Sequence, residues 1–318
     1  MIRVLLFITA ALTLFSCDIV NIFGSDSDNI LLFTGRFSED DHYQIYIYNA
    51  QSGAIDKLTN EKQGVSFFDW SNKSKRIVYH TASNDHNTRY LKTISINGDF
   101  SKTLKNNDGD LIYGSYPHWS PDGNSITYQS GPGVYHGYIS KDEIFMYNLK
   151  RKSETKLTDN FYWDFFPIWN SSGEKVYFNS DREGAFNLYS VDINTKEEEK
   201  ITSEQLAFGF RWFDKPQNLI IYDSRDSLIN GTDRWVNRLV DLNSMQSYKV
   251  PFAPHQEKPN FDYRILDYID PTTVLLVERH KWNDEHGSTL YFWDTESGEL
   301  STILNASFIG MAKEIDLK

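Results

Sequence analysis

The chain is almost without cysteine: Cys17 is the only one among its 318 residues. A single cysteine excludes any disulfide within the chain, so the fold depends on its core and its backbone hydrogen bonds. Long apolar runs are also missing. The apolar stretch near the start, Val4–Leu14, is far shorter than the roughly 20 residues of a membrane-spanning helix.

Positive charge is scarce as well. The chain has 32 Lys and Arg against 44 Asp and Glu, which gives a net charge of −12. Such a protein repels phosphate backbones and anionic head groups, so no nucleic-acid partner is expected. Aromatic residues, in contrast, make up 15% of the chain, a composition that favours strands over helices.

The first residues predict export and a lipid anchor. Arg3 precedes the apolar stretch, as in a signal peptide. The stretch ends in Leu14-Phe15-Ser16-Cys17, which resembles the lipobox of bacterial lipoproteins, although Phe15 is bulkier than the family usually has there. The resemblance implies a signal peptide at 1–16, lipid on Cys17 and a polar lipidated tether at 17–28, with membrane contact through this lipid only. The alternative is an ordinary signal peptide in which the cysteine is accidental.

Four segments repeat one plan, in which an aromatic residue precedes a tryptophan, a polar turn and an alternating apolar strand. They are 67–83, 116–130, 166–180 and 210–224, with Trp70, Trp119, Trp169 and Trp212. A weaker fifth copy, 265–280, has Tyr268 in place of the tryptophan. A period of roughly 40–50 residues is typical of propellers and related repeat folds. We expect the tryptophans to fill the wedge between neighbouring sheets.

The first unit lacks its innermost strand. Ile30–Phe33, His42–Tyr48 and Ile55–Thr59 supply its second, third and fourth strands, and residues 306–312 can supply the first. Closure by the far terminus is favoured because an open ring exposes two strand edges. The sequence therefore predicts an all-β fold over 29–318. We expect a six-bladed β-propeller of four-stranded antiparallel blades, closed by the C-terminal strand that completes blade one.

The repeat resembles the TolB-type six-bladed propeller family, also described as WD40-like. The best match is Pro117-His118-Trp119-Ser120-Pro121-Asp122-Gly123, and the resemblance extends over residues 29–318. It implies a soluble propeller body in the cell envelope. TolB itself has a smaller α/β domain before its propeller, for which this chain has no room, so the TolB role is not inherited directly.

Catalysis is the alternative to binding. No G-x-S-x-G motif occurs, which argues against the hydrolases that carry similar propellers as lids. Other similar propellers are pectic-oligosaccharide lyases, and for that alternative His118 or His280 would be the base. No metal-ligand spacing is present on a single element. No metal, no cofactor and no catalytic residue are therefore predicted in the leading interpretation.

One end of the propeller is predicted to bind a ligand, because loops that enter each inner strand and loops that join the second and third strands gather there. The residues expected to frame this mouth are Trp163, Asp164, Arg182, Arg225 and His280. An aromatic face, a carboxylate and several cations would suit a ligand with an anionic group and an apolar or sugar face. The alternative is that Arg182 and Arg225 only pair with Asp181 and Asp223.

The sequence thus predicts a non-catalytic binding module of the cell envelope, facing the periplasm or the cell surface, with an envelope protein or glycan as partner. A monomer is expected. The alternatives are an oligosaccharide-acting enzyme and a purely structural envelope component.

Overall fold

A computed structural model describes the chain between Ile30 and Ile315. The residues within this range that it does not describe are 38–41, 83–87, 131–140, 185, 203–205, 214–218, 230–231, 243–245, 250–260, 269–272, 281–286, 295 and 307. Beyond Thr202, side chains are described only for 240–242, 265–266, 273–278, 287–294 and 296–305. The signal peptide, Cys17 and the tether therefore lie outside the described residues. In the described part of the chain, no helix has the length and apolar character needed to cross a membrane.

The described strands form six sheets of four strands each, and every neighbouring pair is antiparallel. Sheet 1 contains β24 (Phe308–Ile315), β1 (Ile30–Arg36), β2 (Gln44–Asn49) and β3 (Ala54–Lys57), and sheet 2 contains β4 (Phe67–Ser71), β5 (Arg76–Ala82), β6 (Arg89–Ser95) and β7 (Lys102–Thr103). Sheet 3 contains β8 (Ser115–Trp119), β9 (Ser125–Ser130), β10 (Glu143–Asn148) and β11 (Ser153–Lys156), and sheet 4 contains β12 (Asp164–Trp169), β13 (Lys175–Ser180), β14 (Asn187–Asp192) and β15 (Glu198–Lys200). Sheet 5 contains β16 (Leu206–Phe213), β17 (Leu219–Ile229), β18 (Thr232–Asp241) and β19 (Gln246–Lys249), and sheet 6 contains β20 (Phe261–Tyr268), β21 (Thr273–His280), β22 (Ser288–Asp294) and β23 (Leu300–Ala306).

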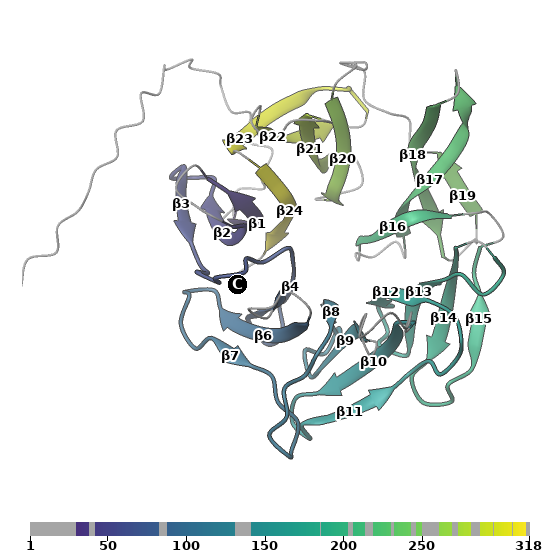
Figure 1. Ribbon diagram of the computed structural model, residues 1–318. Helices are drawn as coiled ribbons and strands as arrows, with labels where there is room; N and C mark the ends of the chain where they lie inside the picture. Colours follow the sequence, from purple (N-terminus) through teal and green to yellow (C-terminus); the bar gives the residue numbers. More distant parts are fainter. Residues whose placement is uncertain are drawn as a thin grey trace, which may run out of the picture.

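The sheets are arranged around a common centre, with the first strand of each sheet innermost (Figure 1). Sheet 1 is built from both ends of the described chain. Its inner strand β24 pairs with β1, in a register that runs from Ile30 opposite Ile315 to Arg36 opposite Phe308. The strand predicted at 306–312 is therefore observed slightly later in the sequence, at Phe308–Ile315, and it pairs with β1, the first of the described strands.

Each sheet has two distinct ends because its neighbouring strands run in opposite directions. The loops that lead into the first strand and those that join the second and third strands lie at one end, which we call the entry end. The turns that join the first to the second strand and the third to the fourth lie at the other end, the turn end. Ile30 lies at the turn end, because it is opposite Asn49 and Ile315 in the register of sheet 1.

The hydrophobic core lies between successive sheets. Strand side chains alternate between two faces, and each face of a sheet meets a neighbouring sheet. Sheets 6 and 1 share one cluster that includes Leu275, Leu31 and Phe33. Sheets 1 and 2 share another, with Ile45 and Phe68, and the pairs 2–3 and 3–4 repeat the arrangement.

The repeated tryptophans belong to this core. Trp70, Trp119 and Trp169 are 6%, 6% and 5% exposed, and each lies in the cluster that its sheet shares with the preceding sheet. The prediction that they fill the wedge between sheets is confirmed for these three. The side chain of Trp212 lies outside the described residues.

The turn after Trp119 shows why the motif ends in glycine. Asp122 Oδ1 accepts hydrogen bonds from Ser120 Oγ at 2.6 Å and from the Asn124 N–H at 3.0 Å. Gly123 has a φ of +70°, a left-handed conformation that costs glycine least. A Cβ at this position would also lie 2.9 Å from both Lys73 Cβ and Ser71 Oγ, so the turn packs closely against the corresponding turn of sheet 2.

Candidate functional site

Three of the predicted mouth residues meet at the entry end of sheet 4. Asp164 begins β12 and is opposite Ser180, the last residue of β13, and Arg182 follows two residues later. The backbone N–H of Trp163 donates to Asp181 Oδ1 at 2.8 Å. The strand register therefore brings Trp163, Asp164 and Arg182 together.

Arg182 is held by several partners. Its Nη2 lies 3.4 Å from each Asp164 oxygen, its Nε donates to Ser180 Oγ at 2.9 Å, and its Nη1 pairs with Glu198. The guanidinium carbon also lies 4.2 Å from the centre of the Tyr189 ring. The ion-pair partners of Arg182 are therefore Asp164 and Glu198, whereas the predicted alternative partner, Asp181, accepts the Trp163 N–H.

Asp164 is completely buried. Burial raises the pKa of its carboxyl group, while hydrogen bonds from Ser180 and Asn160 and the charge of Arg182 act in the opposite direction. Asn160 Nδ2 donates to Asp164 Oδ2 at 2.7 Å. Because protein donors surround it, Asp164 positions Arg182 and has no exposed surface for a ligand.

The exposed part of this region is aromatic. Phe161, Tyr162 and Trp163 are consecutive and are 89%, 40% and 39% exposed. Lys141 Nζ lies 5.6 Å and the Arg182 guanidinium 6.0 Å from the centre of the Tyr162 ring. We call these three residues the aromatic segment. It presents apolar ring faces next to two cations.

A second aromatic group lies on the inner strands. Phe67, Tyr116 and Phe166 each stand three residues before the buried tryptophan of their sheet. The ring centres of Phe67 and Tyr116 are 5.2 Å apart, and those of Tyr116 and Phe166 are 4.3 Å apart. We call these three half-buried residues the aromatic arc, because their rings form a continuous row of contacts across three successive sheets.

Strained backbone and side-chain acceptors fix the arc. Tyr116 and Phe166 have φ values of 52° and 55°, at the irregularity where β8 and β12 shift register against their neighbours. The N–H of Tyr116 donates to His80 Nδ1 at 3.2 Å, and the N–H of Phe166 donates to Gln129 Oε1 at 2.9 Å. His80 and Gln129 occupy equivalent positions, ten residues after the tryptophan of their own sheets. Each acceptor thus links its sheet to the next.

His80 is held in one neutral form. Its Nδ1 accepts the Tyr116 N–H, so the proton is on Nε2, which donates to Ser66 Oγ at 2.9 Å. The side chain is buried, and this burial lowers the pKa of His80 to about 3, with a smaller contribution from the positive charge of Arg89. A protonated His80 could not accept the Tyr116 hydrogen bond.

His118, the candidate base of the enzymatic alternative, lies two residues beyond Tyr116 on β8. Its ring centre is 5.0 Å from that of Phe67, and its Nδ1 is 3.7 Å from Asp69 Oδ2. Asp69 Oδ2 also accepts the Trp119 N–H at 2.8 Å. The carboxylate of Asp69 is therefore engaged in joining sheet 2 to sheet 3.

The other predicted residues are placed only by their backbone. Arg225 lies on β17 opposite Trp235, and His280 ends β21 opposite Phe261. Both positions are toward the entry end of their sheets. Their side chains lie outside the described residues, so their part in a mouth stays a prediction.

Comparison with known proteins identifies the family. The family described as the tricorn protease N-terminal beta propeller domain matches residues 23–232. The chain belongs to this family. A curated relative of this propeller, the Tol-Pal system protein TolB of Helicobacter pylori (strain ATCC 700392 / 26695), is 24% identical over 209 residues, which are 64% of this chain and 47% of the relative. The chain thus spans about half the length of the curated relatives it matches.

Solved structures agree on the fold of this tricorn-type propeller. TolB from Acinetobacter baumannii superposes with a TM-score of 0.68 at 15% identity, covering 90% of this chain and 66% of the other. The tricorn protease gives a TM-score of 0.57 at 13% identity, covering 91% of this chain and 30% of the protease. The resemblance to the TolB-like propeller family that the sequence predicted is confirmed.

At its entry end this tricorn-family propeller presents the exposed aromatic segment and the half-buried aromatic arc. Among the described residues, no group of three or more His, Cys, Asp or Glu side chains is arranged to hold a metal ion. Of these aromatic residues, the sequence analysis singled out Trp163 by function, but it did not predict the contacts within the aromatic arc. The available signal was the aromatic residue that precedes each tryptophan in the repeat.

Proposed function

We propose that this chain is a non-catalytic binding module of the bacterial cell envelope that holds a protein partner at its entry end. The observation that carries the proposal is the aromatic segment, in which Phe161, Tyr162 and Trp163 are all exposed side by side. Three adjacent exposed rings bury large apolar area on contact, and aromatic residues dominate binding energy in protein interfaces. Relatives named Tol-Pal system protein TolB support a role in the envelope.

The six sheets are, in this proposal, the blades of one closed propeller. The pairing of β24 with β1 supports closure, because it covers the inner edge of the only sheet that sequence order would leave incomplete among the described strands. The core shared by sheets 6 and 1 supports it further, since Leu275 of β21 packs with Leu31 and Phe33 of β1. A closed ring gives the partner a rigid surface.

A test of the binding surface compares two ends of the molecule. The double variant Phe161→Ser and Trp163→Ser is expected to weaken capture of the partner from envelope extract at least about tenfold, since aromatic hot spots contribute about 2 kcal/mol or more. Its melting temperature should stay near that of the parent, because exposed rings add little to stability. The control is Ile55→Ser, which removes an apolar side chain, 39% exposed, from the turn end and lies outside both aromatic groups.

The outcome identifies the partner class as well. Capture that disappears when the extract is treated with protease supports a protein partner, whereas capture that survives protease indicates a glycan. Equal capture by the double variant and the control would contradict the proposed surface.

We also propose that lipid on Cys17 holds the module to a membrane. The lipobox-like sequence Leu14-Phe15-Ser16-Cys17 supports this. Replacing Cys17 with Ser is expected to abolish labelling by a radioactive fatty acid and to leave an uncleaved or released protein. A variant that is still labelled and still partitions with membranes would show that the lipobox interpretation is wrong.

A further inference from the structure

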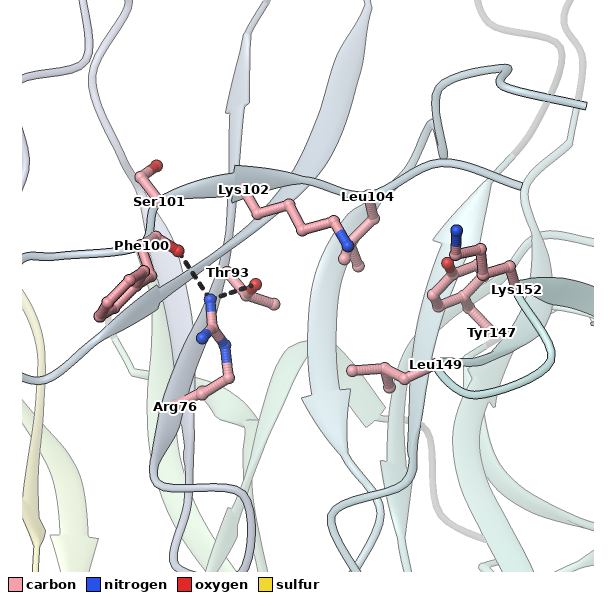
Figure 2. Close-up of a pocket in the computed structure, with 9 residues that line it drawn as sticks. All are labelled: Arg76, Thr93, Phe100, Ser101, Lys102, Leu104, Tyr147, Leu149 and Lys152. Atoms are coloured by element: carbon pink, nitrogen blue, oxygen red, sulfur yellow. Dashed lines mark hydrogen bonds between the residues drawn. The ribbon is translucent and has the colours of Figure 1, made fainter. Parts of the chain in front are cut away.

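A cavity at the turn end lies between sheets 2 and 3, away from the aromatic segment. Its volume is about 430 Å³, within the range of about 300–1,000 Å³ that is typical of small-molecule sites. Figure 2 shows its lining residues, which come from β5, β6, β7, β10 and the segments next to them: Arg76, Thr93, Phe100, Ser101, Lys102, Leu104, Tyr147, Leu149 and Lys152.

The charged residues of this lining are all cations. Arg76, Lys102 and Lys152 line the cavity, and no Asp or Glu does. Among the described residues, none of the three forms an ion pair with a carboxylate. Such a cluster of unneutralised cations is unexpected in a protein with a net charge of −12, because solubility requires net charge and not a local positive site.

Arg76 is held in place rather than mobile. Its Nη2 donates to Thr93 Oγ1 at 3.1 Å and to the carbonyl oxygen of Phe100 at 2.7 Å, as the dashed lines in Figure 2 show. Both acceptors are neutral, so the charge of Arg76 is not cancelled. A fixed guanidinium with donors to spare is a suitable group for binding phosphate or carboxylate.

Beside the hydroxyl groups of Thr93 and Ser101, the remaining lining residues are apolar or aromatic. Leu104 is buried, Leu149 is half-buried, and the Tyr147 hydroxyl donates to the Lys105 carbonyl oxygen at 2.7 Å, so its polar end is already satisfied. Phe100 is 80% exposed at the rim, with a left-handed φ of 55°. A bulky residue in this conformation is strained, and the hydrogen bond from Arg76 to its carbonyl oxygen helps to hold it there.

We propose that this cavity is a binding site for an anionic amphiphile, a molecule in which a phosphate or carboxylate group adjoins an apolar chain. The anionic group meets Arg76, Lys102 and Lys152, and the apolar part lies against Leu104, Leu149 and Phe100. The site does not depend on the partner surface at the entry end. The same chemistry belongs to a lipid head group and to a free small molecule.

The test uses the purified full chain and three probes in titration calorimetry. Octyl phosphate carries both parts of the proposed ligand, inorganic phosphate carries only the anion, and octyl glucoside carries the same apolar chain without charge. We expect octyl phosphate to bind at least about tenfold more tightly than either of the others. Equal binding of inorganic phosphate or of octyl glucoside, or no binding of octyl phosphate, would overturn the proposal.

A pair of matched variants locates the site. Lys102→Gln with Lys152→Gln is expected to weaken octyl phosphate binding about tenfold, and the loss should shrink as salt screens the charges. Lys62→Gln with Lys73→Gln changes the net charge equally at exposed positions outside the cavity lining, and is expected to leave binding unchanged. Equal effects of the two pairs would refute the assignment to this cavity.

A competition experiment then separates the two sources of ligand. Vesicles of phosphatidylcholine with phosphatidylglycerol that displace octyl phosphate assign the site to a lipid head group. Vesicles that leave octyl phosphate bound assign it to a free molecule, and either result keeps the proposed chemistry.

Discussion

Deletion of residues 306–318 is expected to destabilise the protein by several kcal/mol and to make it aggregate. The deletion removes β24, so β1 loses the strand that covers its inner edge. Leu31, Leu32 and Phe33 of β1 are fully buried and contribute to the cores shared with sheets 6 and 2. Exposing such residues lowers the free energy of unfolding about as much as truncating large core side chains does. An unpaired strand edge can also pair with another chain and so promotes aggregation.

Urea unfolding and sedimentation velocity measure the two effects. The matched control removes only 316–318, the residues that follow β24, and should behave as the parent does. For a domain of this size, a loss of about 1 kcal/mol in the free energy of unfolding lowers the melting temperature by about 2–4 °C. If the protein without 306–318 melts within about 2 °C of the parent, the structural role assigned to β24 is wrong.

Acid is expected to lower the free energy of unfolding, because the link between sheets 2 and 3 requires a neutral His80. Burial lowers the pKa of His80 to about 3 in the folded chain, whereas an unfolded histidine titrates near about 6.5. Above that value both states are neutral, and His80 contributes nothing to pH dependence. As the pH falls from about 6.5 toward 3, His80 is protonated in the unfolded chain but stays neutral in the folded chain. The free energy of unfolding therefore falls by up to about 1.4 kcal/mol per pH unit.

The substitution His80→Gln isolates this contribution. Gln129 already accepts the N–H of Phe166 at the equivalent position in sheet 3, so glutamine at position 80 should accept the Tyr116 N–H in the same way. We expect nearly unchanged stability at pH 7 and a shallower loss of stability between pH 6.5 and 4 than in the parent. Parallel pH profiles for His80→Gln and the parent would contradict the proposed link.

The repeat carried enough information to predict the sheets. A tryptophan, a polar turn and an alternating strand are local features, and they recur at intervals of roughly 40–50 residues. The strands of the incomplete first unit follow the same plan, so the predicted second strand Ile30–Phe33 matches β1 and the predicted third strand His42–Tyr48 matches β2. Burial of Trp70, Trp119 and Trp169 followed from the same pattern.

The contacts of the site could not be predicted in this way. Phe67, Tyr116 and Phe166 are nearly 50 residues apart in sequence, and they touch only because the sheets stand side by side and the backbone bulges at Tyr116 and Phe166. Arg182 presents a similar case. The Arg182 side chain folds back so that its Nε donates to Ser180 Oγ, and its Nη2 therefore lies next to Asp164 and not next to the adjacent residue Asp181.

The position of Ile30 has a consequence for orientation in the cell. The described chain begins at the turn end, so a tether that ran from Cys17 to Ile30 would reach the side opposite the aromatic segment. The 12 residues of 18–29 span at most about 40 Å when extended, so a lipid anchor would keep the body within about that distance of the bilayer. A lipid on Cys17 would therefore direct the turn end and its cationic cavity toward the membrane, while Phe161, Tyr162 and Trp163 point away from it, where a partner anchored elsewhere can reach them.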